Sequence, residues 1–336
     1  MQARKRVMLL NPPMDKSGEA ILEPEVEVVR LSNPDRETLL RAVKGVHGLI
    51  ARGVKVTDEV LAQADVLEVV ATPSAGYDHI DIDACSERGI PVVNNTGLNA
   101  VSVAEHTIGL MVGLAKAIPL THHLLRGEGW TSRVPYSWEQ IGFEIDGRTI
   151  GIIGVGNVGS RLAQRVKAAF NMTVLAYDPY VSQEKMREFG ATKVDRLDDM
   201  LPQVDFLSIH APHTKETYHI ISGPQLAKMK PTAYLMNCAR GPLVDEKALV
   251  EALRNKVIAG AALDVFEPEP SLDDNPLYEM PNVIVTPHLA GVTREATKRM
   301  AIGAAEQTLQ VLKGERPPRL VNPEAWDQFV ERRRVH

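Results

Sequence analysis

The chain has 336 residues, a length at which one hydrophobic core usually gives way to two domains. Its hydrophobic fraction of 44%, charged fraction of 24% and aromatic fraction of 5% exclude a disordered chain, a collagen-like chain and a disulfide scaffold. The formal net charge of −5 argues against nucleic acid or an anionic membrane as partner, because both favour a basic protein face, so we expect a small solute instead.

The first hundred residues alternate short apolar runs with helical patterns. Asn33 and Pro34 have the form of an N-cap and first turn for a helix that runs to about Val43, with Gly45 as its stop. This alternation predicts a parallel sheet covered on both faces. The predicted strands are 7–10, 26–29, 47–51, 67–71 and 92–93.

A long helix is predicted next, at 102–120, and a polar, aromatic segment without regular period follows at 127–147. We expect the chain to cross there into a second domain. From residue 149 six predicted strands alternate with helices, as in a doubly wound dinucleotide-binding sheet. These strands are 149–153, 173–177, 206–208, 233–237, 259–263 and 283–285, and a final helix at 294–313 leads to a charged tail that we expect to be solvated or loosely packed.

Three glycines come directly after the strand 149–153 and open a helix. Gly154 permits a tight turn, Gly156 lets the backbone approach a pyrophosphate, and Gly159 lets helix and strand pack closely. We expect the phosphates of a dinucleotide to lie on the backbone amides of Asn157 and Val158.

An acid ends the next predicted strand, at the spacing of a carboxylate that binds the hydroxyls of the adenosine ribose. This acid is Asp178, and its charge would repel a 2′-phosphate, so the pattern predicts NAD rather than NADP. Ordinary turn glycines and a solvated acid are the alternative, which the ordered context of strand, helix and acid disfavours.

Three polar residues with complementary chemistry follow successive strands of the second sheet: Arg240, Glu269 and His288. A guanidinium holds a carboxylate through two parallel hydrogen bonds, and an imidazole exchanges a proton near neutral pH. A carboxylate beside the imidazole favours its protonated form and fixes its tautomer. Any one of them alone is more often a surface or capping residue, but together they indicate proton transfer to or from a carboxylate-bearing substrate.

Six segments together resemble the D-isomer-specific 2-hydroxyacid dehydrogenase family, which includes D-3-phosphoglycerate dehydrogenases and glyoxylate/hydroxypyruvate reductases. The segments are PSAGYDHIDIDAC, NAVSVAEHTIGLMVGLAK, GIIGVGNVG, MNCARGPLVDEKAL, AALDVFEPEP and VTPHLAG. The resemblance implies two Rossmann- or flavodoxin-like parallel-sheet domains. Residues 1–99 and 291–336 would form the substrate domain, with an NAD-binding domain, 100–290, inserted between them. It also implies a homodimer formed through the NAD-binding domain.

The same resemblance implies roles for individual residues of these segments. Arg240 would bind the carboxylate and carbonyl of a small 2-hydroxy or 2-keto acid, His288 would be the acid/base, and Glu269 would support His288. Asp264 would hold the nicotinamide carboxamide. Further contacts are implied for two groups of residues, with Pro212 and Cys238 lining the cofactor and Ser74, Ala75 and Gly76 presenting backbone amides to the substrate carboxylate. Ser74 departs from the family, which usually has a smaller residue there, and its hydroxyl adds a substrate contact or does nothing.

Several alternatives stay open at this point. An NAD-sensing scaffold or corepressor would keep the same site, although no partner-binding extension is recognisable. The aromatic residues of 130–142 would either close part of the substrate pocket or pack on their own domain. Arg52 and Lys55 follow the third strand, where they would meet a substrate phosphate or remain solvated.

The remaining expectations concern metal binding, location in the cell and regulation. Cys85 and Cys238 form no disulfide framework or metal-ligand spacing, and the histidines show no paired-ligand pattern, so we expect no metal. The apolar run 7–10 is too short for a signal peptide, which predicts a cytoplasmic protein. No appended regulatory domain is visible, so we expect no feedback control by serine.

Overall fold

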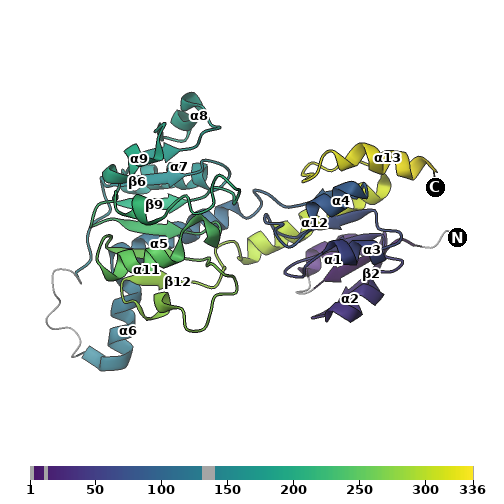
Figure 1. Cartoon of the computed structure of the whole chain (residues 1–336), viewed down its shortest axis with the longest axis horizontal. Coiled ribbons are helices and arrows are strands. Elements are labelled where there is room, and N and C mark those ends of the chain that lie inside the picture. The colour runs from purple at the N-terminus through teal and green to yellow at the C-terminus, as the bar shows by residue number, and fades with distance from the viewer. Residues whose placement is uncertain (1–3, 11–13, 131–140, 336) are drawn as a thin grey trace. The chain divides into compact units, whose positions relative to one another are not determined.

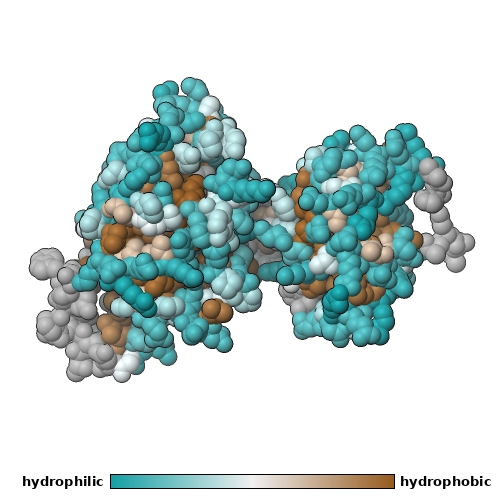
Figure 2. Space-filling view, in the orientation of Figure 1, coloured by the Kyte–Doolittle hydropathy of each residue, from teal (hydrophilic) through white to brown (hydrophobic). Residues whose placement is uncertain are grey.

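The computed structural model describes residues 4–10, 14–130 and 141–335, and the chain folds into two compact units (Figure 1). Unit 1 comprises residues 1–99 and 292–336, and unit 2 comprises residues 100–291. Figure 2 shows hydrophilic residues over most of the visible face of each unit, with smaller hydrophobic areas between them. The prediction of two parallel α/β domains, one inserted into the other, is confirmed.

Unit 1 contains a five-stranded sheet in which every neighbouring pair is parallel. Its order, β2-β1-β3-β4-β5, is that of flavodoxin-like folds. The strands are β1 (Arg6–Leu10), β2 (Glu27–Leu31), β3 (Gly48–Ile50), β4 (Val69–Ala71) and β5 (Val92–Val93).

Alternate side chains of β1 enter two different cores, which explains why the four residues after Arg6 are all apolar. Val7 and Leu9 pack with residues of α1 (Lys16–Leu22), α12 (Arg294–Lys313) and α13 (Ala325–Val335). Met8 and Leu10 pack with residues of α2 (Arg36–Ala42), α3 (Asp58–Gln63) and α4 (Ile82–Glu87). A strand buried on both faces is expected of a covered parallel sheet.

Unit 2 contains a seven-stranded parallel sheet in the order β12-β11-β10-β9-β6-β7-β8. The chain builds outward in one direction from β6 to β8 and in the other from β9 to β12. Ligands of such sheets bind outside the carboxyl ends of the strands at this reversal, between β6 and β9. The strands are β6 (Thr149–Ile153), β7 (Thr173–Tyr177), β8 (Thr192–Lys193), β9 (Phe206–Ile209), β10 (Tyr234–Asn237), β11 (Gly260–Leu263) and β12 (Val283–Val285).

Helices cover both faces of this sheet as well. One core contains residues of α5 (Ala100–Ala115), α7 (Gly159–Phe170) and α8 (Gln183–Glu188). The other contains residues of α9 (Leu197–Met200), α10 (Gly223–Leu226) and α11 (Glu246–Arg254). Short 3₁₀ turns lie at Leu201–Gln203, Gly241–Leu243 and Pro276–Glu279, and α6 (Ile118–Glu128) extends away from the sheet (Figure 1).

Three local predictions were wrong. The single helix predicted at 102–120 is broken into α5 and α6, because Ala117 is left-handed (φ 50°) and Pro119 lies in the first turn of α6, where its missing N–H is harmless. The N-cap of α2 is Asp35, which accepts a hydrogen bond from Thr38 N at 2.7 Å, and Asn33 lies before it. The charged tail is not loosely packed, since α13 buries Trp326 and Phe329 in unit 1.

No single helix in the described part of the chain is long and apolar enough to cross a membrane. The bent pair α5 and α6, with 62° between its helices, passes the same test by length and composition alone. Ten residues of α5 are buried within unit 2, as in a core helix.

Candidate active site

The turn between β6 and α7 needs glycine at two of its three predicted positions. Gly154 is left-handed (φ 85°), and a Cβ there would lie 2.7 Å from Ala211 N. A Cβ on Gly159 would lie 2.1 Å from Gly154 O, so only glycine lets α7 start this close to β6. A Cβ on Gly156 would meet no atom within 4 Å, which leaves the backbone open toward the end of the sheet. An anion fits at this helix N-terminus.

Asp178 follows β7 directly and lies beside this turn. Its Oδ2 accepts a hydrogen bond from Val155 N and its Oδ1 accepts one from Tyr180 N, both at 2.9 Å. Each carboxylate oxygen has a second lone pair, so two ribose hydroxyls can still donate to Asp178. The turn and the acid together fit the pyrophosphate and adenosine ribose of a dinucleotide.

Arg240 follows β10 on a tightly packed loop. Asn237 Nδ2 donates to Arg240 O at 2.8 Å, and Arg240 Nη1 donates to Ala239 O at 2.6 Å. A Cβ on Gly241 would lie 1.8 Å from Phe266 O, so the loop after β10 presses against the loop after β11. The half-buried guanidinium is therefore carried by a backbone with little freedom.

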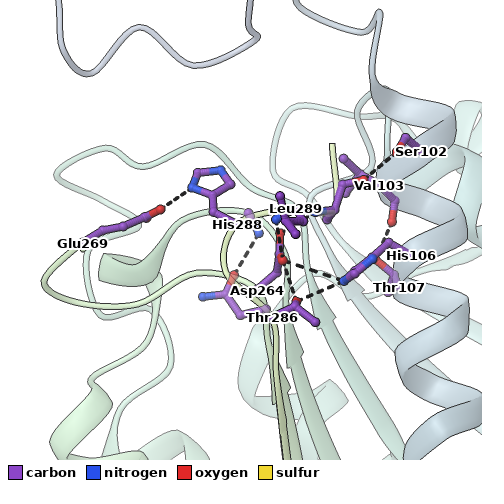
Figure 3. Close-up of polar contacts among 12 residues, drawn as sticks. Ser102, Val103, His106, Thr107, Asp264, Glu269, Thr286, His288 and Leu289 are labelled. Atoms are coloured by element: carbon purple, nitrogen blue, oxygen red, sulfur yellow. Dashed lines mark hydrogen bonds and ion pairs between the residues drawn. The ribbon is translucent and has the colours of Figure 1, made fainter. Parts of the chain in front are cut away.

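His288 and Glu269 form a hydrogen-bonded pair, in which His288 Nδ1 faces Glu269 Oε1 (Figure 3). The side chains are 49% and 37% exposed. A carboxylate only accepts hydrogen bonds, so Nδ1 carries the proton that it donates to Glu269. The other ring nitrogen, Nε2, is then the atom that can exchange a proton with a substrate.

The backbone at His288 is unusual, since φ is 54° in a residue that is not glycine. His288 N donates to Asp264 O at 2.8 Å, and the next two amides, of Leu289 and Ala290, donate to the Asp264 carboxylate at 2.8 Å each. Thr286 Oγ1 also donates to Asp264 Oδ1, at 2.6 Å. The turn that presents His288 is thus held by hydrogen bonds to Asp264 (Figure 3).

Asp264 is only 1% exposed, yet its hydrogen bonds leave room for one more. Oδ1 accepts from Thr286 and Leu289, whereas Oδ2 accepts from Ala290 alone among the described residues. A carboxylate has about four acceptor sites, so a carboxamide N–H fits at Oδ2. The role of Asp264 toward nicotinamide stays a prediction that this geometry allows.

Pro212 and Cys238, predicted to line the cofactor, follow β9 and β10 at the same end of the sheet as the glycine turn. Pro212 is exposed, and Cys238 is 8% exposed. Burial raises the pKa of the Cys238 thiol to about 12, which excludes it as a thiolate nucleophile at neutral pH.

The predicted loop Ser74–Gly76 follows β4 in unit 1. Ser74 Oγ donates to Gly76 O and lies 2.7 Å from Thr72 Oγ1, so this hydroxyl holds the loop itself. Asn94 Nδ2 donates to Ala75 O at 2.9 Å. No atom of the described residues accepts a hydrogen bond from the three backbone amides of this loop, which leaves them available to an anion.

The sequence did not single out two contacts around the site. His219 Nε2 lies 2.6 Å from Glu267 Oε2, two residues before Glu269, and His219 N donates to Pro242 O at 2.8 Å. His106, on α5, lies 3.1 Å from Thr286 Oγ1. Both histidines join segments far apart in the chain, which neither spacing nor periodicity reveals.

Two further predictions concern a metal ion and the aromatic segment 130–142. Within residues 4–10, 14–130 and 141–335 there is no group of three or more His, Cys, Asp or Glu residues that could hold a metal ion. Most of the aromatic segment 130–142, including Tyr136 and Trp138, lies outside the described residues.

Comparison with known proteins decides the family. Residues 108–290 match the model of the D-isomer specific 2-hydroxyacid dehydrogenase, NAD binding domain. The chain belongs to the D-isomer-specific 2-hydroxyacid dehydrogenase family. The predictions of family and of an NAD-binding domain are therefore confirmed.

Three relatives illustrate the match. The chain is 42% identical to D-3-phosphoglycerate dehydrogenase of Methanocaldococcus jannaschii, and the match covers 94% of this chain and 59% of the relative. It is also 42% identical to glyoxylate reductase of Thermofilum pendens, where the match covers 87% of this chain and 86% of the relative. Its fold matches the NADPH-dependent glyoxylate/hydroxypyruvate reductase of Sinorhizobium meliloti, solved with NADP and malonate, with a TM-score of 0.85 and 28% identity over 96% and 98% of the chains. The chain thus spans about three fifths of the phosphoglycerate dehydrogenases that it matches.

Proposed function

We propose that this chain is an NAD-dependent dehydrogenase that interconverts a small D-2-hydroxy acid and its 2-keto acid. The observation that carries the proposal is the hydrogen-bonded pair His288–Glu269, which follows β12 and β11 at the same carboxyl edge of the sheet as the glycine turn after β6. Membership of the family supports the same activity.

Proton transfer is assigned to His288. In the reducing direction its Nε2 gives a proton to the carbonyl oxygen of the keto acid as the carbonyl carbon gains a hydride, and in the oxidising direction Nε2 takes the hydroxyl proton back. Glu269 accepts a hydrogen bond from the Nδ1–H group of His288, which fixes the tautomer of the ring. Arg240 holds the substrate carboxylate, for which a planar guanidinium is suited.

Bound NAD would supply or accept the hydride. The residues that would hold it are those of the glycine turn, with Asn157 and Val158 beside it, together with Asp178, Pro212, Cys238 and Asp264. In unit 1, the substrate domain of this proposal, the amides of Ser74, Ala75 and Gly76 would bind the substrate carboxylate.

The test is a panel of 2-keto acids, each with NADH: hydroxypyruvate, glyoxylate, pyruvate and 3-phosphohydroxypyruvate. We expect at least one to be reduced with a kcat/KM of about 10⁴ M⁻¹s⁻¹ or more, the ordinary range for enzymes. Tight NADH binding without turnover of any acid would contradict the proposal and favour an NAD-sensing protein. If Arg52 and Lys55 meet a substrate phosphate, 3-phosphohydroxypyruvate should rank first and lose that rank in a variant with both cations replaced by glutamine.

We also propose that the chain forms a homodimer through unit 2. Helix α6 exposes Ile118 and Leu125, at 51% and 46%, and such apolar side chains on a projecting helix are typical of an interface. Sedimentation should give twice the chain mass of 36.9 kDa, and Leu125→Glu should shift it toward the monomer. A monomer at micromolar concentration would contradict the proposal.

A further inference from the structure

His106 stands outside the residues assigned so far, but it lies beneath the turn that carries His288. It is on the buried helix α5, and its side chain is 26% exposed. Its Nε2 is 3.1 Å from Thr286 Oγ1 and 3.8 Å from Asp264 Oδ1 (Figure 3).

The direction of these hydrogen bonds follows from the groups involved. Asp264 as a carboxylate only accepts, so the single proton of the Thr286 hydroxyl points to Asp264 Oδ1, 2.6 Å away. The hydroxyl then offers a lone pair to His106, and the ring must donate its Nε2 proton. His106 therefore fixes the orientation of the hydroxyl that binds Asp264.

Asp264 in turn holds the backbone of the His288 turn. Its carboxylate accepts the amides of Leu289 and Ala290, and its backbone carbonyl accepts the amide of His288. Without a donor on the Thr286 hydroxyl, that hydroxyl can rotate away, and a carboxylate that is 1% exposed loses one of its three donors. A buried acceptor that loses a partner is costly, so the turn would loosen.

We propose that His106 is a positioning residue for His288. It acts through Thr286 and Asp264 to keep residues 286–290 in the conformation in which His288 has a φ of 54° and faces Glu269. The inference rests on the proposed acid/base role of His288, since it concerns how that side chain is presented. His106 itself need not touch substrate.

Two variants of His106 separate its hydrogen bond from its volume. His106→Leu fills the space without a donor, whereas the amide of His106→Gln can place an N–H near the position of Nε2. The matched control is Glu105→Gln on the same helix, where the side chain is exposed. Thr286→Val removes the intermediate hydroxyl and is a second route to the same loss if His106→Leu fails to fold.

The first readout is amide hydrogen exchange of a peptide covering 286–291, measured without substrate. We expect exchange there to rise about tenfold in His106→Leu and Thr286→Val, and to stay within about twofold of the unaltered chain in His106→Gln and Glu105→Gln. Unchanged exchange in both donor-less variants would overturn the proposal, and so would an equal rise throughout unit 2, which would mark a general loss of stability.

The second readout is steady-state reduction of the best keto acid together with NADH binding. We expect kcat to fall about tenfold in the two donor-less variants, with KM and the Kd of NADH nearly unchanged, and to recover in His106→Gln. A looser turn with an unaltered kcat would overturn the positioning role. If the unaltered chain reduces no keto acid, the proposed function fails, while the exchange measurement still decides whether His106 orders this turn.

Discussion

At the scale of single residues, His288 carries the proposed proton transfer. Its left-handed backbone makes asparagine a better replacement than alanine, because asparagine tolerates this region and has no proton to exchange near neutral pH. We predict that His288→Asn lowers kcat by about a hundredfold or more, the usual range for a lost acid/base, while the Kd of NADH stays within about twofold. Stopped-flow binding and steady-state rates check this, and near-normal turnover would remove His288 from the mechanism.

Glu269 should support His288 through its negative charge as well as through its hydrogen bond. In Glu269→Gln the side-chain amide oxygen can still accept a hydrogen bond from His288 Nδ1, but the negative charge beside the ring is lost. We predict that kcat for keto acid reduction falls in this variant, by less than in His288→Asn, while the Kd of NADH stays within about twofold. Steady-state rates and NADH binding measure this, with Glu251→Gln, exposed on α11, as control. An unaltered kcat would argue against a role for the pairing.

Asp178 should decide between the two nicotinamide cofactors. Its carboxylate repels a 2′-phosphate, and it also accepts two backbone hydrogen bonds, so Asp178→Asn removes the charge while keeping an acceptor for the turn. We predict a strong preference for NADH in the unaltered chain and a preference reduced about tenfold in the variant. Comparing kcat/KM for the two cofactors tests it, and an equal ratio in both proteins would contradict the role.

At the scale of elements, strand β9 leads directly into a partly buried histidine, His210. Burial lowers the pKa of His210 to about 4, and its Nε2 lies 2.8 Å from Ser208 Oγ. The unfolded chain binds more protons than the folded chain between that value and the ordinary value of about 6.5, so the free energy of unfolding falls as pH drops through this window and is undiminished above it.

We predict that His210 alone lowers the stability of unit 2 by about 2 kcal/mol between pH 7 and pH 5. Urea unfolding at the two pH values should show this loss in the unaltered chain and a smaller one in His210→Gln. His122→Gln, exposed on α6, is the control. The same pH dependence in His210→Gln and the unaltered chain would show that His210 is not the cause.

The sequence predicts elements best where local chemistry decides them. The bounds of β6, β7, β12 and α12 agree with the structure, because apolar runs and a capping threonine define them. The break between α5 and α6 was missed since Ala117 gives no local signal for a left-handed turn. The two-residue edge strand β8 was missed because it is too short for a period.

The contacts of the candidate site also differ in how far the sequence predicts them. The motifs predicted that Glu269 and His288 belong together, and the structure pairs them. The contacts of His106 with Thr286 and of His219 with Glu267 connect residues 180 and 48 positions apart. Such contacts follow from how helix and sheet pack, so no pattern in the sequence predicts them.

At the scale of the whole molecule, the chain consists of two units with separate double-sided cores. In unit 1 and in unit 2 alike, the residues proposed to bind ligand follow the carboxyl ends of parallel strands. We expect this chain to move a hydride between NAD and the C2 carbon of a small acid.

The most direct measurement of that claim follows the hydride itself. The chain is incubated with the keto acid panel and NADH that carries deuterium at both C4 positions, and each product is analysed by chiral chromatography and mass spectrometry. We predict a D-2-hydroxy acid with one deuterium at C2. A product without deuterium, a product of L configuration, or no product from any acid would contradict it.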